Sequence, residues 1–185
     1  MKFGAAIARR IRSNAPACGD KWHLDEVVVT INGRRNWLWR AADQHGATLD
    51  VLVQSRRDRH AARRLMPQRM KKHGHVPHVL VTDKLQSYAA ANRDLGLDLD
   101  HRQHKGLNNQ AENSHQPTRV REKVMRRFKS ARHLQRFASP HDQVANLFMQ
   151  SRYNRDAAAK RAARIQAFKA WGRASGARTF GVTAV

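Results

Sequence analysis

Three apolar runs rich in β-branched residues, separated by two turn signals, constrain the fold of this 185-residue chain more than any other feature. The first run, residues 22–31, contains three consecutive valines and is typical of a buried strand. Asn32-Gly33 is a strong signal for a two-residue hairpin turn, and the segment from Asp43 to Gly46 indicates a second turn. We therefore predict three antiparallel strands over residues 22–31, 36–42 and 48–53.

After Asp58 the spacing of apolar residues changes to that of a helix, which Gly74 and Pro77 end. A fourth strand is predicted over residues 76–82, and the helical crossover makes it parallel to the first strand. The remaining sequence predicts a short N-terminal helix over residues 3–12, a helix over 87–95 and a brief fifth strand over 97–102. Further helices are predicted around Glu112, over 120–131, over 134–148 with an interruption near Pro140, and over 157–171.

This order of elements is that of the α/β ribonuclease H-like (integrase core) fold, a mixed five-stranded sheet with flanking helices and, here, a helical C-terminal extension. We predict four parts: an N-terminal leader or linker remnant over residues 1–20, the core over 21–135, the helical extension over 136–174 and a flexible tail over 175–185.

The composition indicates an anionic partner, because the chain has 36 Lys and Arg but only 14 Asp and Glu, which gives a formal net charge of +22. The partner can be nucleic acid or anionic lipid. The basic residues run along the whole chain instead of one amphipathic helix, which favours nucleic acid. No stretch approaches the roughly 20 apolar residues of a membrane helix. Cys18 is the only cysteine, so no intrachain disulfide forms, as is usual in a cytoplasm.

Three of the few acidic residues stand in contexts that indicate a metal site. Asp25 lies in the middle of the first predicted strand, Asp83 at the end of the fourth and Glu112 near the start of a helix. Hard cations such as Mg²⁺ prefer oxygen ligands, and a basic protein that binds Mg²⁺ indicates phosphodiester chemistry on nucleic acid. From local sequence alone, Asp83 can also be a turn former and Glu112 a first-turn helix acid.

Six stretches of this chain resemble the transposases of the insertion-sequence-six family, and the resemblance covers roughly residues 3 to 172. The first stretch reads Lys-Trp-His-Leu-Asp-Glu-Val and the last reads Met-Arg-Arg-Phe-Lys-Ser-Ala-Arg-His. In full, the six stretches are Lys21–Val27, Asn36–Asp43, Leu52–Asp58, Val81–Tyr88, His101–Arg119 and Met125–His133. The resemblance implies that Asp25, Asp83 and Glu112 are the DDE catalytic triad of an integrase core.

The resemblance further implies a two-metal site for Mg²⁺ or Mn²⁺, in which Asp25 bridges the metals and Asp83 and Glu112 complete the two sites. Arg119, seven residues after Glu112, matches a basic residue of the family. The run from 119 to 136 holds eight Lys or Arg and one Glu, which favours contact with DNA phosphates. The residues expected to bind phosphate are Arg119, Lys84, Arg121, Arg126, Arg127 and Lys129.

The expected function is that of a DDE transposase catalytic core that cleaves DNA strands and transfers them in transposition. Its expected partners are the transposon ends, target DNA and further copies of itself in a homo-oligomer on DNA. The expected location is the cytoplasm of a bacterium, associated with the nucleoid and not with a membrane. We also expect the chain to lack the N-terminal helix-turn-helix region of the family. The alternative is a non-catalytic, basic nucleic-acid-binding remnant of a transposase.

Overall fold

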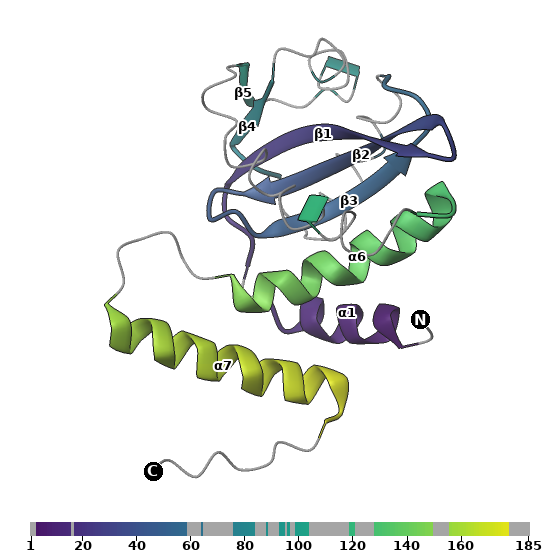
Figure 1. Cartoon of the computed structure of the whole chain (residues 1–185). Helices are drawn as coiled ribbons and strands as arrows, with labels where there is room; N and C mark the ends of the chain where they lie inside the picture. Colours follow the sequence, from purple (N-terminus) through teal and green to yellow (C-terminus); the bar gives the residue numbers. More distant parts are fainter. Residues whose placement is uncertain are drawn as a thin grey trace. The chain divides into compact units, whose positions relative to one another are not determined.

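The central strand of the sheet is β1 (Lys21–Ile31), which pairs antiparallel with β2 (Arg34–Asp43) and parallel with β4 (Val79–Thr82). The strand β3 (Thr48–Gln54) extends the antiparallel side and β5 (Asp100–Gln103) the parallel side, so the order is β3-β2-β1-β4-β5. Figure 1 shows β1, β2 and β3 as one twisted layer. This mixed five-stranded sheet is the predicted ribonuclease H-like arrangement, and the prediction is confirmed.

The computed structural model describes residues 3–15, 17–58, 76–83, 99–103, 128–149 and 156–177, with the single positions 64, 88, 93, 94, 96, 119 and 120. The chain divides into two compact units. The sheet unit is residues 17–138, and the helical unit is residues 1–16 with 139–185. Among the helices of the described residues, none is both long enough and apolar enough to cross a lipid bilayer.

The two turns between the antiparallel strands form for the reasons that the sequence indicates. Asn32 and Gly33 both take left-handed backbone angles, with φ of 50° and 76°, between the paired residues Ile31 and Arg34. A tight hairpin of this kind requires positive φ at both central positions. At the second turn, Asp43 Oδ1 accepts hydrogen bonds from the backbone N–H groups of His45 and Ala47, each at 2.9 Å.

The two faces of the sheet bury different apolar clusters, because successive side chains of a strand point to opposite faces. One face carries the fully buried rings of Trp22, Trp39 and Tyr88, and its cluster is completed by Leu24, Ala41, Leu49 and Leu80. The other face packs β-strand residues against helical ones; this cluster comprises Val29, Ile31, Leu38, Val51, Phe128, Leu134, Phe137 and Ala138. The sheet is therefore covered on both faces, as its parallel half requires.

Helix α6 (Ala131–Phe148) begins in the sheet unit, where its residues Leu134, Phe137 and Ala138 pack against the second face. Ser130 caps it, since its Oγ accepts the N–H of His133 at 3.1 Å. Gln135 binds the edge strand β3: its side chain accepts from Val53 N at 2.7 Å and donates to Val51 O at 3.0 Å. These bonds satisfy part of an edge that would otherwise be open to another chain.

Two predictions about the helices are wrong. The predicted helix over 120–131 does not run through to Ala131, because residues 128–130 are non-helical and the Ser130 cap starts a new helix. The predicted interruption near Pro140 is absent, because α6 is continuous through that residue. A proline inside a helix removes one backbone hydrogen bond, and α6 accommodates this loss. Pro140 lies close to Gly4, since a Cβ added to Gly4 would be 3.5 Å from the proline side chain.

The buried Leu134 gives a test of how α6 stabilises the sheet unit. Its side chain is completely buried in the second cluster, so Leu134→Ala removes buried methyl groups and leaves a cavity. We expect the free energy of unfolding to fall by about 2–5 kcal/mol. Urea unfolding measures this change. The control is Val28→Ala, because Val28 on β1 is 46% exposed. Equal losses for both variants would show that α6 does not pack as described.

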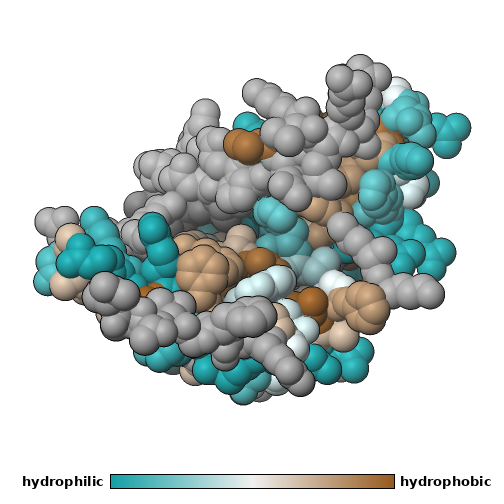
Figure 2. Space-filling view, turned by 60° about the horizontal axis from the view of Figure 1, so that its bottom comes forward, coloured by the Kyte–Doolittle hydropathy of each residue, from teal (hydrophilic) through white to brown (hydrophobic). Residues whose placement is uncertain are grey.

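The helical unit contains α1 (Gly4–Ser13) and α7 (Ala157–Ser175), which contact each other. Arg10 Nη1 donates to the carbonyl of Ala174 at 3.2 Å, and Asp156 caps α7 by accepting the N–H of Ala159. Some apolar side chains of this unit stay exposed; they are Phe3, Phe148, Met149, Ile165 and Phe168. The face of the molecule drawn in Figure 2 has brown patches among teal residues. Phe148 and Phe168 form an edge-to-face pair at 5.1 Å.

Candidate active site

The sheet brings two of the predicted acidic residues side by side. Asp25 lies in the middle of β1, where its backbone pairs with that of Arg40 on β2. The parallel pairing of β1 with β4 ends at Leu24 and Thr82. The next residues along the two strands are therefore Asp25 and Asp83. The pairing of the two strands brings these residues together, although 58 positions separate them in the sequence.

A third carboxylate, that of Glu26, lies beside this pair. Asp25, Glu26 and Asp83 each place one carboxylate oxygen within 4.8 Å of the others. Neighbouring residues of a strand point to opposite faces, but among the described residues the pairing of β4 with β1 goes no further than Thr82 and Leu24. Side chains from both faces of β1 can therefore approach Asp83 there. Sequence reasoning did not select Glu26.

The crowding of acidic groups changes how readily Asp25 ionises. Burial is the largest cause, and with the negative charge of Asp83 it raises the pKa of Asp25 to about 6. A backbone hydrogen bond at Glu26 and the positive charges of Arg119 and Arg57 act in the opposite direction on this pKa. The proton therefore competes with any cation for the Asp25 carboxylate in mildly acidic solution.

Glu26 is held by two side chains that come from other parts of the chain. Its Oε1 accepts hydrogen bonds from Arg57, one of them from Nε at 2.8 Å, and its Oε2 accepts from Tyr88 Oη at 2.8 Å. Burial raises the pKa of Glu26, and these two hydrogen bonds lower it. Both carboxylate oxygens of Glu26 therefore accept hydrogen bonds.

His101 on β5 supports the end of β4 next to Asp83. Its Nε2 lies 3.0 Å from Thr82 Oγ1, which also donates to the carbonyl of Asp83 at 2.8 Å. Burial lowers the pKa of His101, which favours the neutral ring. A neutral ring adds no positive charge beside the carboxylates.

The structure places the remaining predicted site residues as follows. Arg119 is exposed and close enough for its charge to lower the pKa of Asp25. Lys129 lies at the far end of β1, where its carbonyl accepts from Asn32 Nδ2 at 3.2 Å. Asn32 follows the end of β1 and is seven positions along the chain from Asp25, which corresponds to about 23 Å of extended strand. The others lie outside the described residues: Glu112, Lys84, Arg121, Arg126 and Arg127.

Three residues of the site were not predicted, namely Glu26, Arg57 and Tyr88. All three stand within stretches that carry the family resemblance. Their contacts join residues 31 and 62 positions apart. No periodicity in the sequence reports such a pairing. The signal that could have found Glu26 is a second acid in a strand that is otherwise buried, because a buried charge needs a partner.

Comparisons with known proteins show the family to which this chain belongs. The family profile of the IS240 transposase DDE domain matches residues 19–151. Among curated proteins, the transposase for insertion sequence-like element IS431mec of Staphylococcus aureus strain Mu50 is 34% identical over 106 residues, which are 55% of this chain and 47% of that protein. The transposase for insertion sequence element IS257 in transposon Tn4003 of Staphylococcus aureus matches equally well. The chain thus spans about half the length of these relatives.

The fold also resembles a solved structure. A chain of the cryo-electron-microscopy structure of the simian T-cell lymphotropic virus intasome in complex with PP2A regulatory subunit B56 gamma matches with a TM-score of 0.51 and 11% identity. The match covers 93% of this chain and 60% of that one. This likeness concerns the fold alone. The family profile covers well over half of the sequence, so the chain belongs to the DDE domain family of IS240-type transposases, within the insertion-sequence-six family.

Proposed function

We propose that this chain is the catalytic core of a transposase that cuts DNA strands and joins them to new positions with the help of divalent metal. The observation that carries the proposal is the juxtaposition of Asp25 and Asp83 on the central strand and at the end of its parallel neighbour. Membership of the DDE domain family supports it.

The donor set fits a hard divalent cation. Three carboxylates offer oxygen atoms within 4.8 Å of one another, and oxygen is the ligand that Mg²⁺ and Mn²⁺ prefer. Two bound metals supply a polarised water and a stabilised leaving oxygen for phosphoryl transfer. In this proposal Asp25 would help to hold both metals, and Asp83 and Glu112 would each help to hold one.

The proposed reaction has two balanced steps. In the first, the oxygen of a water molecule forms a bond to phosphorus and the bond from phosphorus to the 3′ oxygen breaks. One proton of the water passes to the 3′ oxygen, which becomes a hydroxyl, and the other leaves to solvent, so that a 5′-phosphate remains. In the second, that hydroxyl loses its proton and attacks a phosphorus of target DNA, whose own 3′ oxygen leaves and is protonated. The number of phosphodiester bonds is unchanged in the second step, so no further energy source is required.

The residues of the chain have separate tasks in these steps. Asp25 and Asp83 orient the cations, and the rigid central strand fixes Asp25 more firmly than a loop would. Arg119 lies near Asp25 and contacts the phosphate that reacts. Lys84, Arg121, Arg126, Arg127 and Lys129 bind phosphates further along the DNA. We also propose that the chain acts as a homo-oligomer that holds two transposon ends together.

The experiment that tests this function uses the full chain with two DNA substrates. Nicking of a supercoiled plasmid in Mg²⁺ or Mn²⁺ reports cleavage, and joining of a duplex with a free 3′-hydroxyl to the plasmid reports strand transfer. We expect both products with metal and neither after chelation. DNA binding without either product would identify the chain as the non-catalytic remnant and overturn the proposal.

Metal should stabilise the fold in a pH-dependent way. Without metal, the raised pKa of Asp25 means that protonation stabilises the folded state at low pH, and this contribution is lost as the pH rises through about 6. Metal replaces the proton above that pH. At ten times its Kd, Mg²⁺ should add about 1.4 kcal/mol, or about 3–6 °C in Tm, at pH 7.5 and much less at pH 5. Differential scanning fluorimetry measures the shift, and a shift that is independent of pH would contradict a role for Asp25.

A further inference from the structure

Arg57 is an arginine beside the acidic pair that is restrained on three sides. Its guanidinium donates to Glu26 Oε1, lies 4.9 Å from the centroid of the Trp37 ring and places Nη2 3.6 Å from Asp83 Oδ2. Planar stacking with paired hydrogen bonds is a geometry that arginine makes and lysine does not. The side chain is 37% exposed, so these contacts, not burial, fix its position.

The anchor of Arg57 is itself part of the core. The Glu26 side chain is only 1% exposed, and its second oxygen accepts the Tyr88 hydroxyl. Tyr88 is fully buried and packs edge-to-face on Trp39, with ring centroids 5.6 Å apart. A continuous set of contacts therefore runs from Trp39 through Tyr88 and Glu26 to Arg57.

Asp83 is the residue that needs such support. The pairing of β4 with β1 ends one residue earlier, at Thr82, so the strand ladder does not extend to Asp83. The Asp83 carboxylate is also next to that of Asp25, whose negative charge repels it. A fixed positive charge 3.6 Å away offsets this repulsion and gives the Asp83 carboxylate a preferred direction.

We propose that Arg57 is a positioning residue of the site: held by Glu26 and Trp37, it keeps the Asp83 carboxylate beside that of Asp25, ready to bind a divalent cation. This inference rests on the function proposed above. Arg57 acts through Asp83 and makes no contact with the reacting phosphate. Groups that hold a metal ligand in place commonly change metal affinity by about 10- to 100-fold when they are removed.

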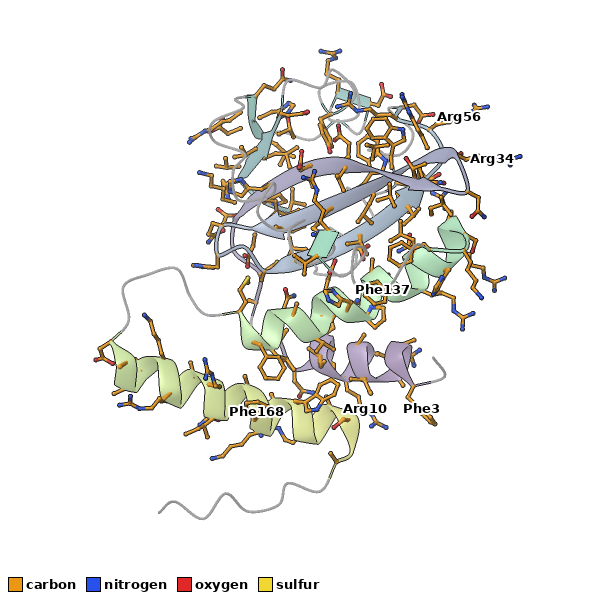
Figure 3. The ribbon with its side chains drawn as sticks, in the orientation of Figure 1. Phe3, Arg10, Arg34, Arg56, Phe137 and Phe168 are labelled. Carbon is orange, nitrogen blue, oxygen red and sulfur yellow. The ribbon has the colours of Figure 1, made fainter. Side chains whose placement is uncertain are left out.

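The test measures Mn²⁺ binding to the full chain by electron paramagnetic resonance, without DNA. We expect Arg57→Gln to weaken Mn²⁺ binding about tenfold or more. Arg57→Lys should give an intermediate loss, because an ammonium keeps the charge but not the paired geometry. The matched control is Arg56→Gln, which removes the same charge from the adjacent residue, whose side chain extends away from the sheet (Figure 3). Its Mn²⁺ affinity should equal that of the wild-type chain.

Plasmid nicking at varied Mg²⁺ and varied DNA provides the second readout. The Mg²⁺ concentration for half activity should rise in Arg57→Gln by the same factor as the Mn²⁺ Kd, and kcat should recover at saturating Mg²⁺. The KM for DNA should stay within about twofold. A raised KM for DNA with unchanged Mn²⁺ affinity would mean that Arg57 contacts DNA, and would overturn the inference.

The outcomes separate this inference from the proposed function. If the wild-type chain binds no Mn²⁺, the proposed function fails. If the wild-type chain binds Mn²⁺ and Arg57→Gln binds it equally well, only the role of Arg57 fails. If Arg57→Gln shows no cooperative melting transition, the Mn²⁺ affinity of Arg57→Lys tests the inference instead. A wild-type Mn²⁺ affinity in that variant overturns the inference.

Discussion

Asp25→Asn should abolish metal-dependent nicking and strand transfer, with a loss of about a thousandfold or more. The substitution replaces a charged oxygen ligand by a neutral amide of the same shape. A metal supplies several kcal/mol of transition-state stabilisation in phosphoryl transfer, and about 1.4 kcal/mol corresponds to a tenfold change in rate. Initial rates of plasmid nicking in Mg²⁺ measure the loss, and Asp83→Asn should lose activity to a similar degree.

The fold of Asp25→Asn should be at least as stable as that of the wild-type chain without metal. Burial and the charge of Asp83 raise the pKa of Asp25, so the ionised carboxylate disfavours folding at pH 7.5 and a neutral amide removes that cost. The control is Asp100→Asn on β5, whose side chain is 52% exposed and pairs with Arg102 at the surface. An exposed pair contributes little, so its nicking rate should stay within about twofold. Comparable losses in both variants would count against a metal role for Asp25.

The sheet was predictable from the sequence because its signals are local. The Asn32-Gly33 turn fixes the register of β1 and β2, and the helix predicted from the apolar spacing after Asp58 favours a parallel pairing of β4 with β1. The errors lie where a local signal competes with packing. Pro140 is a helix breaker by composition, yet it lies inside α6. Residues 128–130 are non-helical and Ser130 caps the start of α6. The apolar spacing from Val120 to Ala131 does not indicate this break.

The site was predictable only in part. Strand order is sufficient to place Asp25 next to Asp83, because both positions follow from the pairing of β1 with β4. The contacts of Arg57 and Tyr88 with Glu26 depend on how loops and a buried ring fold back onto the sheet, which neither charge nor periodicity determines. Glu112 lies outside the described residues. Its convergence on Asp25 and Asp83 stays a prediction from the family resemblance.

Binding to duplex DNA should depend steeply on salt. The chain has a net charge of +22, and each phosphate that a Lys or Arg neutralises releases condensed counterions. If six or more phosphates are neutralised, affinity should fall by a factor of about 10³ between 50 and 200 mM salt. Fluorescence anisotropy with a labelled duplex at several salt concentrations gives the slope. Two duplexes of unrelated sequence should give the same slope, because phosphate contacts carry no base information.

Single substitutions can assign parts of this slope to named residues. Arg119→Gln and Lys129→Gln should each reduce its magnitude by about one, as expected for the loss of one phosphate contact. The control is Arg102→Gln, which lowers the net charge by the same amount. Arg102 already pairs with Asp100, its Nε donating at 2.8 Å, so the slope should be unchanged. Equal reductions in all three variants would show that the salt dependence of DNA affinity reflects net charge alone. The basic residues near Asp25 and at the end of β1 would then not form a defined binding surface.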